Sequence, residues 1–207
     1  MAKYPCEFDK LGLSYLEYYA QHEAFHPGVD LNLGAGDADL GNPVVAPIDL
    51  EIEYIAPIGQ SNGGFGNFII AYSTAYGVWM RFAHLNTVNV KLHDRVKMGQ
   101  QIGTVGKTGT TSAHLHWEIF NEMCYDLQGS KYLFYPKGKS KQWVSEHYLD
   151  PLKFITDINE GEQWEKECEQ RVKELGLLKD VEGFVANMTP HKVMQLTLNL
   201  YDLLTKK

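Results

Sequence analysis

The sequence predicts a mainly β protein with a small α-helical extension at its C-terminal end. Between His26 and Phe120, short runs of β-branched and aromatic residues alternate with glycine, as is typical of antiparallel strands joined by turns. Beyond residue 156, apolar residues recur at helical spacing instead. The 207 residues, 44% of them hydrophobic, are enough for one sizeable core with an appendage.

The first 25 residues form an aromatic-rich lead-in, in which we expect a short helix around residues 13–21. The glycines of segment 62–67 predict a turn. The three glycines within 94–106 predict a tight crossing where two backbones approach closely. The candidate strands are residues 44–56, 67–73, 78–85, 101–106 and 114–120.

The segment after the last candidate strand, residues 121–147, predicts a loop or hairpin with a basic tip, and residues 148–155 close the domain. Two helices are then expected, at 160–175 with Gly176 as its cap, and at 189–204 after a Thr-Pro start. The chain is therefore expected to divide into a lead-in at 1–25, a β domain at 26–155 and a helical extension at 156–207.

Charge and composition exclude several classes of partner. The net charge of −7 disfavours nucleic acid and anionic membrane surfaces. No run approaches the roughly 18 apolar residues of a membrane span. Three distant cysteines without a CxxC pair suggest neither a disulfide framework nor a cysteine zinc site. No secretory signal is expected at the N-terminus, which predicts synthesis in the cytoplasm and release by lysis or carriage on a virion.

The stretch AHLHWEIF, residues 113–120, carries two histidines within an apolar run. In a strand, His114, His116 and Glu118 point to one face, and the apolar residues between them point to the other. One interpretation is the exposed polar face of an edge strand. The other is a functional site, and the rest of the chain has to decide between them.

Two further motifs favour a site. HPGVD places His26 and Asp30 four residues apart, and His84 lies near the end of a candidate strand. Zinc prefers four tetrahedral ligands, and a hydrolytic site keeps one position for water, so two histidines and an aspartate are enough to hold the ion. The two remaining histidines are then available to move protons and stabilise charge. His114 and His116 lie roughly 7 Å apart along a strand, so one of them can bind the metal while the other faces the water.

HPGVD, FAHL and HLHWE, in this order, resemble the signature of the lysostaphin-like zinc metalloendopeptidases, a family of peptidoglycan hydrolases. The resemblance extends over residues 26–155 and implies a small antiparallel β domain with an open groove. It implies that His26, Asp30 and His116 are the zinc ligands. It also implies that His114 is the general base and that His84 stabilises the charge that develops on the attacked carbonyl.

The sequence departs from the family pattern at three places. Phe82 stands where the family often has tyrosine, Trp117 replaces phenylalanine, and the stretch before the HLH motif is about one residue short. None of these changes removes a predicted ligand.

Other polar and aromatic residues are assigned less specific roles. Glu118 is expected to pack or to support a ligand. His22, His93, His147 and His191 are expected to be ordinary surface or packing residues, and Lys137, Lys139 and Lys141 a solvated loop tip. Tyr132, Phe134, Tyr135 and Trp143 are candidates for a groove wall or for packing within a hairpin.

The sequence thus predicts a zinc-dependent endopeptidase that hydrolyses peptide bonds of bacterial cell-wall peptidoglycan, and an enzyme of the phage endolysin type is expected. A glycine-rich interpeptide bridge and a direct cross-link between stem peptides are both candidate substrates. The alternatives are a non-catalytic scaffold or activator that binds a wall enzyme or peptidoglycan, and a structural virion component. Scaffolds of this fold usually lack metal ligands, and here none is missing.

Overall fold

The computed structural model of the chain describes residues 1–121 and 135–174. The chain divides into two compact units, Ala2–Ile155 and a second that holds Met1 and begins again at Thr156. Apart from Met1, the described residues of the second unit lie in helix α2, Pro151–Glu174, which begins within the first unit. No helix in the described part of the chain has the length and apolar content needed to cross a bilayer.

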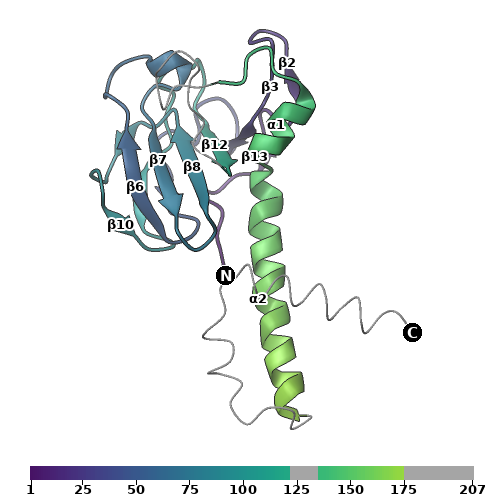
Figure 1. Cartoon of the computed structure of the whole chain (residues 1–207). Helices are drawn as coiled ribbons and strands as arrows, with labels where there is room; N and C mark the ends of the chain where they lie inside the picture. Colours follow the sequence, from purple (N-terminus) through teal and green to yellow (C-terminus); the bar gives the residue numbers. More distant parts are fainter. Residues whose placement is uncertain (122–134, 175–207) are drawn as a thin grey trace. The chain divides into compact units, whose positions relative to one another are not determined.

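The first unit is built on an eight-stranded sheet, in which β6, β7, β8 and β12 run side by side (Figure 1). Every pair of neighbouring strands is antiparallel. The strand order is β1 (Lys10–Leu11), β4 (Gly28–Asn32), β12 (Leu115–Phe120), β8 (Val78–Ala83), β7 (Ile69–Ser73), β6 (Leu50–Ile55) and β10 (Arg95–Val96), with β13 (Tyr148–Leu149) paired to the far end of β12. The prediction of a mainly antiparallel β fold is confirmed, and the open groove stays a prediction.

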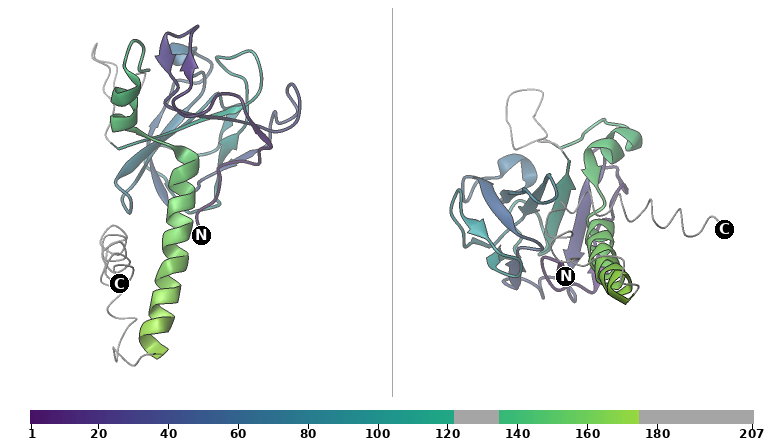
Figure 2. Two further views of the ribbon diagram at one scale, coloured as in Figure 1. Left: turned by 90° about the vertical axis from the view of Figure 1, so that its right-hand side faces the viewer. Right: turned by 60° about the horizontal axis from the view of Figure 1, so that its bottom comes forward.

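Two smaller sheets and short helices complete the unit. The hairpin β2–β3 forms a separate two-stranded sheet away from the large one (Figures 1 and 2). The remaining elements are β2 (Tyr18–Tyr19), β3 (Ala24–Phe25), the three-stranded sheet of β5 (Pro43–Val45), β11 (Gln101–Thr104) and β9 (Thr87–Val88), the 3-10 turn η1 (Asn62–Gly64) and helix α1 (Lys141–His147).

Strand β12 lies in the interior of the sheet, and every one of its side chains is buried. Leu115, Trp117 and Ile119 point to one face, where Phe82 stacks on Trp117. The opposite face is covered by an apolar cluster of Ala56, Phe65, Phe68, Ile70, Ala83, Phe120, Val144 and Tyr148. The interpretation of the histidine segment as an exposed edge strand is therefore wrong, because β4 and β8 flank it and both faces are covered.

Three local predictions are also wrong. Residues 13–21 form no helix, because Tyr18 and Tyr19 pair with β3 and Glu17 accepts the backbone N–H of His26. The predicted strand 44–56 is two strands in different sheets, β5 and β6. Part of the predicted loop 121–147 is helix α1, where the Ser140 side chain caps the N-terminus by accepting from Trp143 N.

The helix predicted at 160–175 is present, but it begins at Pro151 because Asp150 accepts the N–H groups of Leu152 and Lys153. The helix predicted at 189–204 lies outside the described residues.

Candidate metal centre

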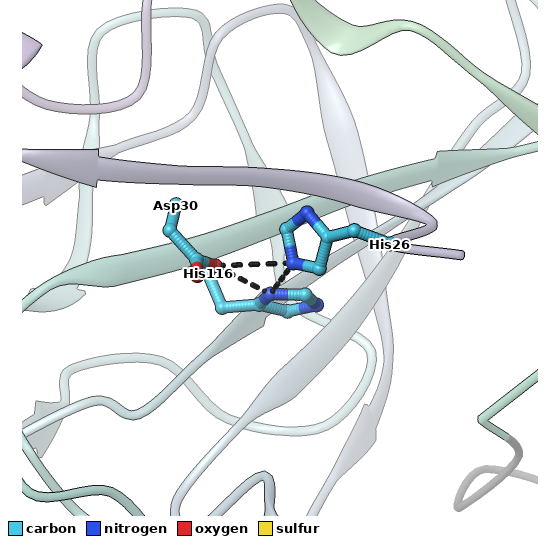
Figure 3. Close-up of side chains that lie close together, drawn as sticks. All are labelled: His26, Asp30 and His116. Atoms are coloured by element: carbon cyan, nitrogen blue, oxygen red, sulfur yellow. Dashed lines mark hydrogen bonds and ion pairs between the residues drawn. The ribbon is translucent and has the colours of Figure 1, made fainter. Parts of the chain in front are cut away.

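Three predicted ligands converge on one point beside β4 and β12. His26 lies just before β4, Asp30 within it, and His116 within β12, where the register places His116 directly opposite Asp30. His26 Nε2 lies 3.0 Å from His116 Nδ1 and 3.3 Å from Asp30 Oδ1. His116 Nδ1 lies 2.8 Å from Asp30 Oδ1. Figure 3 shows the three side chains pointing toward one another.

The size of this triangle suits zinc. Donor atoms bound about 2.0–2.1 Å from a tetrahedral zinc ion lie about 3.3 Å from one another. The three edges of 3.0, 3.3 and 2.8 Å are slightly shorter than that, so a small expansion would admit the ion. Among the residues described, no other group of three His, Cys, Asp or Glu side chains brings its donor atoms so close together.

Hydrogen bonds on the outer side fix which nitrogen of each histidine faces inward. His26 Nδ1 lies 3.3 Å from the carbonyl oxygen of Ser14, which can only accept, so Nδ1 carries the proton. His116 Nε2 lies 2.7 Å from Glu118 Oε1, and Glu118 is ion-paired with Arg81. His116 therefore donates from Nε2. In the neutral rings, the inner nitrogens present lone pairs to each other and to Asp30.

Lone pairs this close repel unless a cation lies among them. Burial acts to raise the pKa of Asp30, but hydrogen bonds from His116 and His26 outweigh it and hold the pKa well below its ordinary value. Burial acts to lower the pKa of His116, but hydrogen bonds to Asp30 and Glu118 reverse this and raise the pKa to about 9. The donor set thus demands a positive charge, which either a proton or a divalent metal ion supplies.

The other two predicted histidines lie next to this triangle. The ring of His84 is 4.6 Å from that of His114 and 5.8 Å from that of His116, measured between centroids. His84 Nδ1 lies 2.9 Å from Thr108 O, and His114 Nδ1 lies 3.1 Å from Ser112 O. Both carbonyls only accept, so both rings are protonated at Nδ1 and keep Nε2 as an acceptor. The structure therefore brings all five predicted site residues together.

Both of these histidines are neutral near pH 7. Burial lowers the pKa of His84 to about 3, with the nearby charges of His116 and His114 acting in the same direction. Burial also lowers the pKa of His114, against the opposing effect of Asp30. His84 has a φ of 61°, a left-handed conformation that is uncommon outside glycine and frequent at functional sites. Each ring can accept a proton during a reaction.

Two buried residues support the site, and the sequence predicted one of them. Glu118 is completely buried and contacts His116, which agrees with its predicted role of supporting a ligand. Arg81 is buried as well and donates to Glu118. Sequence reasoning missed Arg81, although an arginine in the apolar run VWMRFA was a usable signal, because a charged residue inside a buried strand needs a partner.

The departure at Phe82 does not reach the site. Phe82 is fully buried and stacks on Trp117, on the face of the sheet opposite His116. A tyrosine hydroxyl at this position would lie in the apolar core.

The remaining predicted residues lie away from the metal centre or outside the described chain. His22 and His93 are exposed, and the ring of His147 stacks on Trp143 at 3.9 Å. Lys137 and Lys141 are exposed, and Lys139 lies over the Trp143 ring. Tyr135 packs near Phe65, with 6.1 Å between ring centroids. Tyr132, Phe134 and His191 lie outside the described residues.

Comparisons with known proteins agree on one family. The sequence model of peptidase family M23 matches residues 24–128, half of the chain, and this range contains all five site residues. The chain is 38% identical over 96 residues to the glycyl-glycine endopeptidase ALE-1 of Staphylococcus capitis, covering 45% of the chain and 24% of that protein. It is 35% identical over 109 residues to the murein hydrolase activator NlpD of Salmonella dublin, covering 50% of the chain and 25% of that protein.

Among solved structures, the catalytic domain of the antimicrobial peptidase lysostaphin from Staphylococcus simulans has the same fold. It aligns with a TM-score of 0.52 at 28% sequence identity, covering 71% of this chain and 92% of that domain. By contrast, the matched region spans about a quarter of the length of each of the two relatives above.

Proposed function

The chain belongs to peptidase family M23, and from this premise we propose that it is a zinc-dependent endopeptidase that hydrolyses peptide bonds in bacterial cell-wall peptidoglycan. The observation that carries the proposal is the convergence of His26 Nε2, Asp30 Oδ1 and His116 Nδ1, each offering a lone pair to one point. A triad of two histidines and one carboxylate leaves one tetrahedral position open, as catalytic zinc sites do.

In this proposal His26, Asp30 and His116 hold the ion, which when bound supplies a Lewis acid for water and for the scissile carbonyl. His114 accepts a proton from the attacking water at Nε2, because its Nδ1 is already committed to Ser112 O. The water oxygen bonds to the carbonyl carbon, the carbon–nitrogen bond breaks, and the proton passes to the departing amine.

His84 is proposed to stabilise the oxyanion of the tetrahedral intermediate. Its Nδ1 proton is held by Thr108 O, so Nε2 can donate to an oxyanion only after it has taken up a proton. The hydrogen bonds give His84 and His114 the same tautomer, so the assignment of the base to His114 rests on the resemblance to the family. The carriage of the enzyme to the wall, by lysis or on a virion, stays a prediction.

The proposal is tested by digesting purified peptidoglycan of several cross-link types with the zinc-loaded chain and identifying the products by mass spectrometry. New amino termini are expected, and a chelator or the substitution His116→Ala abolishes them. The matched control is His93→Asn, because His93 is exposed and asparagine tolerates its φ of 68°. Release of sugar reducing ends without new amino termini would contradict a peptidase.

A second candidate function is that of an activator of another wall enzyme, which the similarity to a murein hydrolase activator supports. An activator keeps its effect on a partner hydrolase when His116 is replaced by alanine, whereas a peptidase loses its own hydrolysis. The complete set of five site residues favours the peptidase.

A further inference from the structure

A buried ion pair lies directly behind the candidate metal ligand His116. Glu118 and Arg81 are register partners on β12 and β8, two positions along β12 from His116, which pairs with Asp30. The side chain of Arg81 is 1% exposed and that of Glu118 is 0% exposed. Burying two charged groups away from water is unfavourable unless they are paired and hydrogen-bonded.

The two oxygens of Glu118 divide their contacts between two donors. Oε2 accepts from Arg81 Nη1 at 2.8 Å, and Oε1 faces His116 Nε2 at 2.7 Å. Arginine has only donors, so its N–H at Oε2 favours the ionised carboxylate, which can only accept at Oε1. His116 is thereby held with its proton on Nε2, and Nδ1 is directed toward His26 and Asp30.

The surrounding residues are shaped for this pair. The Arg81 guanidinium lies 4.1 Å from the centre of the Phe65 ring, and 5.5 and 6.0 Å from the centres of the Phe68 and Phe120 rings. Such contacts stabilise a cation where water cannot. On the other side of β12, Gly28 is the register partner of Glu118. A Cβ on Gly28 would lie 2.9 Å from Glu118 Cγ and 2.2 Å from the carbonyl oxygen of Trp117, so only glycine leaves this space.

We propose that Arg81 and Glu118 are positioning residues that fix the tautomer and orientation of His116 and so prepare its Nδ1 to bind a divalent metal ion. This inference rests on the proposed function in that it takes His116 for a ligand of the metal. Arg81 donates to the Glu118 carboxylate, and the carboxylate accepts from His116 Nε2. His116 Nδ1 then presents its lone pair to the metal position.

The first test needs no substitution. In the full-length chain labelled with [15N]histidine and loaded with zinc, NMR correlation of ring nitrogens and carbons identifies the protonated nitrogen of each histidine. The expected pattern for His116 is a proton on Nε2 that exchanges slowly, with Nδ1 bound to metal. A His116 ring protonated at Nδ1 overturns the proposal.

The second test measures zinc affinity by competition with a chromogenic chelator. Glu118→Gln offers Arg81 and His116 one oxygen and one NH2 group in place of two oxygens, so the ring loses its acceptor or the arginine loses its partner. We expect zinc affinity to fall on the order of 10–100-fold. Arg81→Met is expected to fall similarly, and Arg81→Lys, which retains a cationic donor, is expected to recover part of the loss.

The matched controls are Glu51→Gln and Arg95→Met. Glu51 and Arg95 form another cross-strand pair of the same sheet, with 3.1 Å between Arg95 Nε and Glu51 Oε2, but Arg95 is 84% exposed. These controls should leave zinc affinity and the His116 nitrogen shifts unchanged. Unchanged affinity and unchanged shifts in Glu118→Gln overturn the proposal.

The outcomes separate this inference from the proposed function. If Glu118→Gln weakens zinc binding and the wild-type chain cleaves no peptidoglycan, the positioning role stands and the enzymatic proposal fails. If the wild-type chain cleaves peptidoglycan and Glu118→Gln binds zinc as tightly as wild type, the enzymatic proposal stands and the positioning role fails.

Discussion

The substitution Gly66→Ala tests how the glycine turn before β7 supports His84 and its proposed role in catalysis. Gly66 has a φ of 62°, and a Cβ there would lie 2.1 Å from the carbonyl oxygen of Thr108. This same oxygen accepts the hydrogen bond from His84 Nδ1. The Thr108 hydroxyl also accepts from Asn67 N and donates to Leu85 O, so the turn, the end of β8 and His84 are tied together through one residue.

The expected loss of stability has two parts. An alanine in the left-handed region costs about 1–2 kcal/mol. Pushing the Thr108 backbone away adds about 1–3 kcal/mol for overpacking. The control Gly77→Ala isolates the first part, because Gly77 has a φ of 67° and nothing within 4 Å of an added Cβ.

Urea unfolding of the two variants measures the difference between them. Gly66→Ala should lower the free energy of unfolding by about 1–3 kcal/mol more than Gly77→Ala does. Peptidoglycan turnover should fall by up to about 10²-fold in Gly66→Ala alone, because a shift of about 1 Å at Thr108 misplaces His84. Equal destabilisation in both variants, or unchanged turnover in Gly66→Ala, would refute the reasoning.

Three further predictions concern protons, thiols and the two outer histidines. Because the pKa of His116 is raised to about 9, zinc uptake at pH 7 should release about one proton, and this release should disappear above pH 9. Calorimetry of zinc binding in buffers of different ionisation enthalpy measures the proton release. Equal heats of binding in all buffers would contradict the prediction. Burial, and to a smaller extent the charge of Asp39, raise the pKa of the Cys6 thiol to about 12. Iodoacetamide at pH 8 should therefore modify Cys6 only after the chain is unfolded in urea, as measured by peptide mass spectrometry. Modification of Cys6 in the folded chain would contradict the prediction. His84→Gln and His114→Gln should each reduce kcat on the order of 10²-fold or more while the chain retains its zinc; loss of the metal from either variant would show that the histidine is a ligand.

Local patterns in the sequence were sufficient for β8 and β12, but β4, which carries Asp30, was not among the candidate strands. Alternation within HLHWEIF correctly separated the face of His116 and Glu118 from that of Trp117. The triad itself was predicted from motif order, since nothing local to His26 shows that it meets His116, ninety residues away. That contact depends on the register between β4 and β12, which places His116 opposite Asp30.

Predictions failed where a distant partner overrides local preference. Residues 13–21 look helical on their own. In the structure Leu16 N donates to His26 O and His26 N donates to Glu17 O, and these hydrogen bonds hold the segment in a turn followed by the short strand β2. Arg81 becomes interpretable only when β8 lies beside β12 and brings it to Glu118. The early start of α2 was readable from the Asp-Pro pair, because Asp150 caps the helix and Pro151 begins it.

Metal content most directly tests the claim that His26, Asp30 and His116 bind one divalent ion. The full-length chain is dialysed against a small excess of zinc and then against metal-free buffer, and zinc per chain is measured by inductively coupled plasma mass spectrometry. We predict one zinc per chain in wild type and none in Asp30→Ala. The control Asp49→Asn should also retain one zinc, because the Asp49 carboxylate pairs with Lys97 at the surface. A wild-type chain without zinc, or an Asp30→Ala chain that holds as much zinc as wild type, would contradict the account.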